Sequence, residues 1–235
     1  MNLILSVFVP DGIVLGTYSI DVYHEKHKEG ESSSVIHVEN GWPHSYILFE
    51  KYGMVFYGSA LIGEKSLQHY LDEFQELYRN KEPSIEQLPQ LLLNFIKDIK
   101  GANHLFYLAG YARNELGSLE PFVYSASLEG NSYSRININQ NNKPISYFHT
   151  CGKSTVIEKL FNTVKVKQEE TWVEIPPTPI RFEHFSIEKA HIFAELILRS
   201  TYLIENMNNI SDLNAIPVEI ISVKRNGSQY VNIKK

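Results

Sequence analysis

The hydrophobic periodicity of this chain changes in blocks along the sequence, and this block order limits the folds that it can adopt. The first part carries short apolar runs rich in β-branched and aromatic residues, which predict strands. From Ser66 the apolar residues fall three and four positions apart, which predicts two successive amphipathic helices, over residues 67–78 and 85–99. The early strands are expected at residues 3–9, 13–18, 35–38, 46–49 and 54–57.

Strand-like runs return after these helices, and a long helix precedes a terminal hairpin. Ser84 is expected to cap the second helix, whose regular part should start near Leu88 because Pro89 suits a first turn. Asn226-Gly227 is typical of a type I′ turn between two strands. The later strands are expected at residues 104–111, 121–128, 133–138, 218–224 and 229–234, and the later helices at residues 152–163 and 186–207.

This segregation of strands and helices favours an α+β sandwich, in which antiparallel sheets pack together and helices cover the outside, over a parallel sheet. The prolines at positions 176, 177 and 179 interrupt regular structure. The part that follows them is too small to fold alone, so we expect a single domain over residues 1–235.

The charge balance and the cysteine content exclude several classes of function. Lys and Arg total 22 against 27 Asp and Glu, a net charge of −5, which gives no reason to expect binding to nucleic acid or to an anionic membrane. No apolar run approaches the roughly 18 residues of a membrane-spanning helix, and the first residues lack the features of a signal peptide. The single cysteine, Cys151, excludes an internal disulfide. We therefore expect a soluble, cytoplasmic protein.

No cofactor and no metal ion is predicted. Gly152-Lys153-Ser154-Thr155 resembles the end of a phosphate-binding loop, but that motif needs a further glycine where the chain has Tyr147. His24 and His27 lie in a charged stretch, residues 21–34, without an apolar stripe, which predicts a solvated loop rather than a metal site.

Cys151 is also the only residue that could act as a reactive thiol. The positive end of the helix expected after it, together with Lys153, would lower the pKa of the thiol, and His149 lies two residues away. The alternative is that Cys151 is a small buried hydrophobic residue, which is the common situation of a lone cysteine.

Four segments, in order along almost the whole chain, resemble the proteasome β-type subunits and the bacterial proteasome-like proteins of the N-terminal-nucleophile hydrolase superfamily. This resemblance implies a four-layer αββα sandwich with two packed antiparallel sheets. The matching segments are Asp11-Gly12 with residues 13–16, Ala109-Gly110-Tyr111 with residues 121–125, residues 151–161, and the helix from Ser186 together with residues 216–221.

The same resemblance implies that the family's catalytic site is lost here. Active members use a terminal threonine whose α-amino group is the general base, together with an acid and a lysine. Aligned on Asp11-Gly12, these three positions hold Asn2, Tyr18 and Ser34. A carboxamide cannot form the acyl ester, so no catalytic residue is predicted. Tyr18 is expected to be a packed aromatic residue or to fill a vestigial pocket.

The sequence therefore favours a non-catalytic, proteasome-like subunit that acts in assembly or binding. The resemblance implies a homo-oligomer, either a ring or a dimer, with contacts through the helical layers and a possible protein partner. Two alternatives stay open: an active N-terminal-nucleophile peptidase or amidohydrolase with a shifted nucleophile, and a small-molecule binding module that has kept the cleft.

Overall fold

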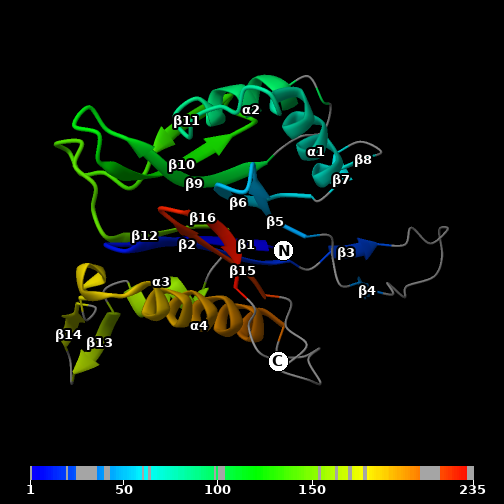
Figure 1. Cartoon of the computed structure of the whole chain (residues 1–235). Helices are drawn as coiled ribbons and strands as arrows, with labels where there is room; N and C mark the ends of the chain where they lie inside the picture. The colour runs from blue at the N-terminus through cyan, green and yellow to red at the C-terminus, as the bar shows by residue number, and fades with distance from the viewer. Residues whose placement is uncertain are drawn as a thin grey trace, which may run out of the picture.

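Two antiparallel sheets of five strands each form the centre of the molecule in the computed structural model (Figure 1). The strand order is β12-β1-β2-β15-β16 in the first sheet and β11-β10-β9-β6-β5 in the second. The structure describes residues 2–19, 21–24, 36–39, 43–59, 61–62, 65–97, 99, 104–152, 155–161, 164–168, 171–176, 179–206 and 218–231.

The first sheet comprises β1 (Asn2–Val9), β2 (Gly12–Ser19), β12 (Tyr147–Gly152), β15 (Val218–Lys224) and β16 (Gly227–Tyr230). The second comprises β5 (Ser45–Leu48), β6 (Tyr52–Tyr57), β9 (Leu105–Arg113), β10 (Leu119–Ser127) and β11 (Ser132–Arg135). Short two-stranded sheets pair β3 (Asp21–His24) with β4 (Ile36–Glu39), β7 (Leu61–Ile62) with β8 (Lys65–Ser66), and β13 (Val164–Gln168) with β14 (Thr171–Ile175).

Helices cover the outer face of each sheet, so the described chain has three buried apolar layers. Helices α1 (Leu67–Tyr78) and α2 (Leu88–Ile96) pack on the second sheet. Helices α3 (Thr155–Phe161) and α4 (Ile187–Asn206), with a short 3₁₀ turn at Phe182–His184, cover the first sheet. The third layer lies between the two sheets. Because both faces of the central strands are covered, every residue from Leu3 to Val9 is buried.

Most of the expected elements are present. The mixed α+β class with two antiparallel sheets is confirmed, and the arrangement is compatible with the expected sandwich. Ser66 caps α1 by accepting a hydrogen bond from the His69 backbone N–H at 3.2 Å. The capping role expected of Ser84 is wrong, since α2 follows Gln87 and has no side-chain cap. Instead, the Ser84 carbonyl accepts from the N–H groups of Gln87 and Leu88, which forms a separate turn before the helix.

Three further expectations need correction. Residues 21–24 are a strand rather than a loop, because β3 pairs with β4 through Val22 and Val38. The strand expected at residues 133–138 stops at Arg135. Beyond that point the Asn137 side chain, rather than a strand carbonyl, accepts the Val123 N–H at 3.0 Å. The strands β12, β13 and β14 were not expected at all, and they carry several polar residues.

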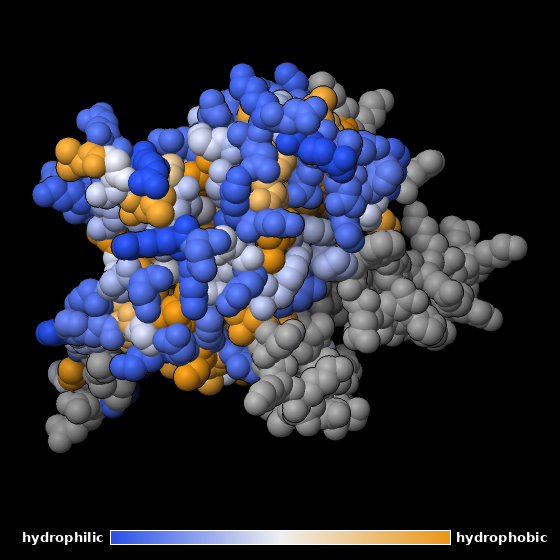
Figure 2. All heavy atoms as spheres, viewed as in Figure 1, coloured by the Kyte–Doolittle hydropathy of each residue, from blue (hydrophilic) through white to orange (hydrophobic). Residues whose placement is uncertain are grey.

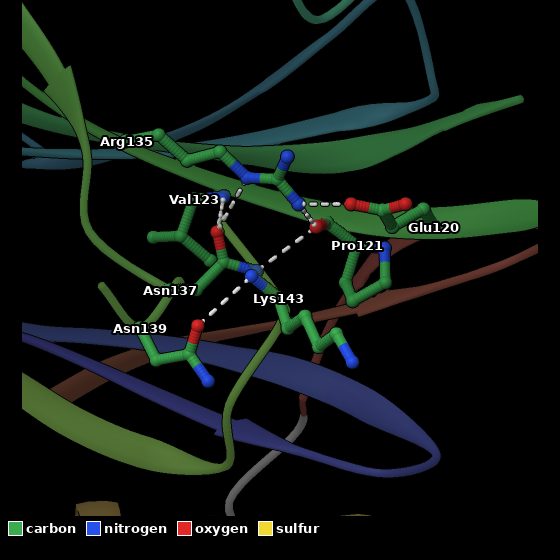
Figure 3. A network of polar contacts seen from close by, with 7 residues as sticks. All are labelled: Glu120, Pro121, Val123, Arg135, Asn137, Asn139 and Lys143. Atoms are coloured by element: carbon green, nitrogen blue, oxygen red, sulfur yellow. Dashed lines mark hydrogen bonds and ion pairs between the residues drawn. The ribbon is translucent and has the colours of Figure 1, made fainter. Parts of the chain in front are cut away.

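A polar network fixes the segment that follows β11 against β10 (Figure 3). Nη2 of Arg135 donates to the Glu120 carboxylate at 2.6 Å and to the Pro121 carbonyl at 2.8 Å. The Arg135 guanidinium also lies 3.7 Å from the ring centroid of Phe122. Asn137 is fully buried, and its amide donates to the same Pro121 carbonyl at 2.9 Å. These contacts satisfy the buried polar groups at this edge, so the network is structural.

Candidate functional site

The end of the sandwich where β1 begins is the place to which the resemblance assigns a catalytic site. At this end β2 finishes and β15 starts, and Asn2 pairs with Ser19 while Tyr18 pairs with both Leu3 and Val218. The strands β5 and β9 of the second sheet start at the same end, and β6 finishes there. Ser34, the third expected position, lies outside the described residues.

Tyr18 is a packed aromatic residue, as expected. Its side chain is fully buried in the layer between the first sheet and α4. The ring stands edge-on to Tyr202, with 5.6 Å between the centroids and an interplanar angle of 89°. Position 18, to which the resemblance assigns the family's acid, therefore contributes an aromatic side chain to the helix-facing core. An aromatic pair of this geometry adds to the stability of that core.

A carboxylate bridges the two sheets at this end. Glu219 lies on β15 directly opposite Thr17, and it accepts a hydrogen bond of 2.6 Å from the Ser45 hydroxyl on β5. The same oxygen accepts from the His44 backbone N–H at 3.1 Å. The Tyr230 hydroxyl donates to the Ser45 carbonyl at 3.0 Å, so a second strand of the first sheet is fastened to β5.

Two histidines hold the backbone that leaves β6. Nε2 of His44 lies 3.2 Å from the Gly58 carbonyl, and Nε2 of His104 bonds the neighbouring carbonyl of Ser59. Phe56 separates the two rings and stacks on His44 with 4.4 Å between centroids. Because carbonyl oxygens only accept hydrogen bonds, both contacts place a proton on Nε2.

Burial sets the electrostatics of this cluster. It raises the pKa of Glu219, although the hydrogen bonds from Ser45 and His44 oppose the effect. Burial and then the charge of Glu219 raise the pKa of Tyr46, and burial is the main cause of the raised pKa of Tyr230. Burial lowers the pKa of His104, which favours a neutral imidazole. The cluster thus disfavours additional charge.

The cluster of Glu219, Ser45 and His44 joins the two sheets, and its hydroxyl is not free to attack a substrate. Ser45, Thr17 and Ser6 are each fully buried, and the Ser45 hydroxyl is committed to Glu219. An attacking hydroxyl must reach a substrate carbonyl and a general base at the same time. None of these three side chains has that access in the described part of the molecule.

Cys151 differs from the reactive thiol that its place before a helix suggested. It belongs to β12 and is partly buried between the sheets, and burial raises the pKa of its thiol. The positive end of α3 therefore does not dominate the pKa of Cys151. His149 is on the same strand, and its Nδ1 lies 2.7 Å from the Tyr107 hydroxyl, so its nearest polar partner is a buried phenol.

Two cavities lie in the described part of the molecule, away from this strand end. One, of about 800 Å³, lies beside the β5–β6 turn and α1, and the other, of about 520 Å³, lies beside the α1–α2 connection and β11. Within the described ranges, no three His, Cys, Asp or Glu side chains gather in a way that could hold a metal ion. None of the described helices is both long and apolar enough to cross a membrane.

Sequence reasoning did not identify the bridge between the sheets. One residue in the sequence could have indicated the bridge. Glu219 is a lone carboxylate within the largely apolar residues 216–223. A charged residue at an inward strand position indicates either a partner or a raised pKa. The partner could not be found in this way, since Ser45 is 174 residues away in the chain.

Comparison of the sequence with models of known protein families gives no match. No curated protein matches the chain either.

Proposed function

We propose that this chain is a non-catalytic cytoplasmic subunit with the proteasome-like N-terminal-nucleophile hydrolase fold, and that it acts by assembling with further copies of itself. The observation that carries the proposal is the packing of the described side chains at the end of the sandwich where β1 begins. There Tyr18 fills the helix-facing core where the family has an acid, and the Glu219–Ser45 bridge joins the sheets beside it.

The order of the layers supports the fold assignment. The resemblance implies two packed antiparallel sheets with helices outside, and the described chain has helices on both outer faces of such a pair (Figure 1). The β1–β2 hairpin turns at Pro10-Asp11, and Gly12 starts β2 opposite Val9, so the Asp11-Gly12 pair that resembles the family's first hairpin lies at this turn. Asn2 then stands at the start of β1, where active relatives carry the nucleophile.

The surface of the α3–α4 layer supports assembly. Ile192 and Leu196 follow one another at a helical spacing of four on α4, and 66% and 59% of their surfaces are exposed. Leu160 on the adjacent α3 is 54% exposed. Figure 2 shows hydrophobic residues along the lower edge of the molecule, where this layer lies. Neighbouring exposed apolar side chains of this kind mark interaction surfaces.

A hydrolase with a shifted nucleophile has less support. Among the described hydroxyls near the strand end, those of Ser45, Thr17 and Ser6 are buried, and burial raises the pKa of the Cys151 thiol, which disfavours the reactive thiolate. Neither group combines access with an adjacent base, so the non-catalytic assignment is the better fit.

Two measurements on the purified full chain test the proposal. A fluorogenic peptide panel should give no turnover above buffer, and light scattering after size exclusion should give a mass that is a multiple of 27.0 kDa. Ile192→Glu should lower that mass, because a charge would be buried in the contact. The matched control is Leu116→Glu, at a loop position that is 89% exposed and distant from α4, which should keep the wild-type mass.

Turnover that disappears when one serine, threonine or cysteine is replaced would reject the non-catalytic assignment. A wild-type chain that stays at 27.0 kDa at all concentrations would reject assembly.

A further inference from the structure

The turn between β15 and β16 places an exposed asparagine directly before a glycine. Arg225 and Asn226 form this two-residue turn, because the ladder pairs Lys224 with Gly227. Both turn residues are exposed. Neither has a positive φ, so the turn is not the type I′ turn that the sequence predicted. Asn226 also lines the cavity of about 800 Å³ that lies beside the β5–β6 turn.

The fold requires a glycine at position 227 for two reasons. The φ of Gly227 is +131°, a value that residues with a Cβ rarely adopt. A Cβ at this position would also lie 3.0 Å from the backbone oxygen of Glu50, in the turn between β5 and β6. The β15–β16 hairpin lies against β6 (Figure 1). The contact between the two turns therefore keeps Asn226 followed by the one residue that has no side chain.

An asparagine before a glycine is open to attack by its own backbone. The nitrogen of Gly227, once it has lost its proton to hydroxide, forms a bond to Cγ of Asn226, and the side-chain nitrogen takes up a proton and leaves as ammonia. The absence of a Cβ on Gly227 lets the two atoms approach. Lys224 and Arg225 lie directly before Asn226 and place positive charge near the anion that forms. Water then opens the cyclic imide at either carbonyl, which gives aspartate or isoaspartate at position 226.

The strand ladder restrains this attack without preventing it. Gly227 and Lys224 form the last pair of the hairpin, so this pair must open before the Gly227 nitrogen can turn toward Cγ of Asn226. The pair closes an exposed turn, and β16 is at the edge of its sheet. Hairpin ends of this kind open at a small cost in free energy. The reaction is therefore slower in the folded chain than in the unfolded chain, but it proceeds in both.

We propose that Asn226 is a site of spontaneous modification, at which the native protein gains aspartate and isoaspartate. The charged residues that line the adjacent cavity carry a formal charge of −2, and either product adds one negative charge to it. Isoaspartate also lengthens the main chain by one methylene group, directly before two contacts between the turns. The Ser228 N–H donates to the Glu50 carbonyl at 3.2 Å, and the Ser228 hydroxyl donates to the Lys51 carbonyl at 2.8 Å. The modification therefore weakens the contact between the two turns.

Peptide mapping by mass spectrometry tests the site on the full chain, incubated at pH 8 and 37 °C. Asn226 should convert at least about tenfold faster than Asn142, which is the internal control, because only Asn226 precedes a residue without a Cβ. Asn142 is also exposed in a loop, but Lys143 follows it. Asn226→Gln should give no product at this position, since its longer side chain would have to close a larger ring.

Urea unfolding tests the structural consequence. All chains in this measurement also carry Asn40→Gln, which removes the other Asn-Gly pair of the sequence. During incubation the unfolding midpoint should fall as modified Asn226 accumulates, and it should stay constant in the chain that carries Asn226→Gln. Asn226→Asp adds the charge without lengthening the main chain, so it should lower the midpoint less than isoaspartate does.

The inference is overturned if Asn226 stays intact in the folded chain while it reacts in urea, because the turn would then protect it. It is also overturned if Asn226 and Asn142 react at the same rate. A constant midpoint in fully modified chains would reject the weakened contact between the turns. Neither readout depends on peptidase activity or on the mass of an assembly, so the proposed function is tested separately.

Discussion

Glu219 and Ser45 belong to different sheets and are joined by a hydrogen bond of 2.6 Å. The bond is partly buried, and the His44 N–H donates to the same carboxylate oxygen. A carboxylate at such a position loses hydration, and two hydrogen bonds replace only part of it. Burial accordingly raises the pKa of Glu219 despite both donors.

The first prediction concerns the pH dependence of folding stability. A carboxyl whose pKa is raised in the folded state stabilises the fold fully below its unfolded value, near 4.5, and loses that contribution as the pH rises through the folded value. Glu219→Gln stays neutral and keeps an oxygen for Ser45 and His44. Urea unfolding should show a flatter pH profile for the variant, and a gain on the order of 1 kcal/mol at pH 7.

Glu115→Gln provides the control for this measurement, since Glu115 is exposed in the turn between β9 and β10. Its profile between pH 4 and pH 8 should follow that of the wild type. A Glu219→Gln profile parallel to the wild type would show that the carboxyl titrates alike in the folded and unfolded chains.

The second prediction concerns Tyr18. Restoring an acid with Tyr18→Asp would place a carboxylate in the fully buried layer that contains Tyr202. The loss of aromatic packing and the burial of a charge should together lower the free energy of unfolding by about 4 kcal/mol. Thermal melting measures the loss, and a peptide assay should detect no gain in activity.

Tyr18→Phe separates packing from polarity in this experiment, because it retains the ring that faces Tyr202. Its cost should be well below that of Tyr18→Asp, because no charge is buried and the aromatic packing is kept. Equal losses in the two variants would mean that the ring is not the main contributor at this position.

The third prediction concerns the close approach of the two sheets at Gly53 on β6. A Cβ added there would lie 2.6 Å from Cγ2 of Val223 and 3.1 Å from side-chain carbons of Ile221 and Leu15. These residues belong to the other sheet, so Gly53→Ala must push the sheets apart and should cost about 1–3 kcal/mol in urea unfolding. At Gly130 the nearest atom to an added Cβ is the side-chain oxygen of Ser132 at 3.0 Å, and the next is that of Ser127 at 3.8 Å. Gly130→Ala should therefore change stability by less than about 0.5 kcal/mol.

The elements that could be predicted from sequence are those whose burial pattern is local. In α1 the buried residues Leu67, Leu71 and Phe74 recur at helical spacing, and the β1–β2 hairpin combines two apolar runs with Asp11-Gly12. In both cases the buried residues follow one another within a short window of the sequence, so the order of apolar residues alone indicates the element. The alternation of these blocks then predicted the α+β sandwich, without the pairing order of the strands.

Edge strands and contacts between sheets could not be predicted in this way. In β12 only Phe148 is buried, and exposed or half-buried residues such as His149 and Thr150 surround it. The strand therefore lacks the apolar run that would have predicted it. The bridge of Glu219 to Ser45 depends on packing two sheets face to face, and no local window contains both residues. The reactivity suggested for Cys151 was inferred from its neighbours in the sequence, a helix end, Lys153 and His149, whereas burial between the sheets is the largest influence on its pKa and raises it.

The fourth prediction concerns that thiol. Because burial raises the pKa of Cys151, little thiolate is present at pH 7.5, and the half-buried side chain also limits access. Iodoacetamide should therefore modify Cys151 in the folded chain at least about tenfold more slowly than in urea, and the folded rate should still be rising at pH 9. Intact mass follows the single modification, and Cys151→Ser supplies the baseline. Equal modification rates in the folded chain and in urea would instead support an accessible, activated cysteine. That result would favour a hydrolase with a shifted nucleophile.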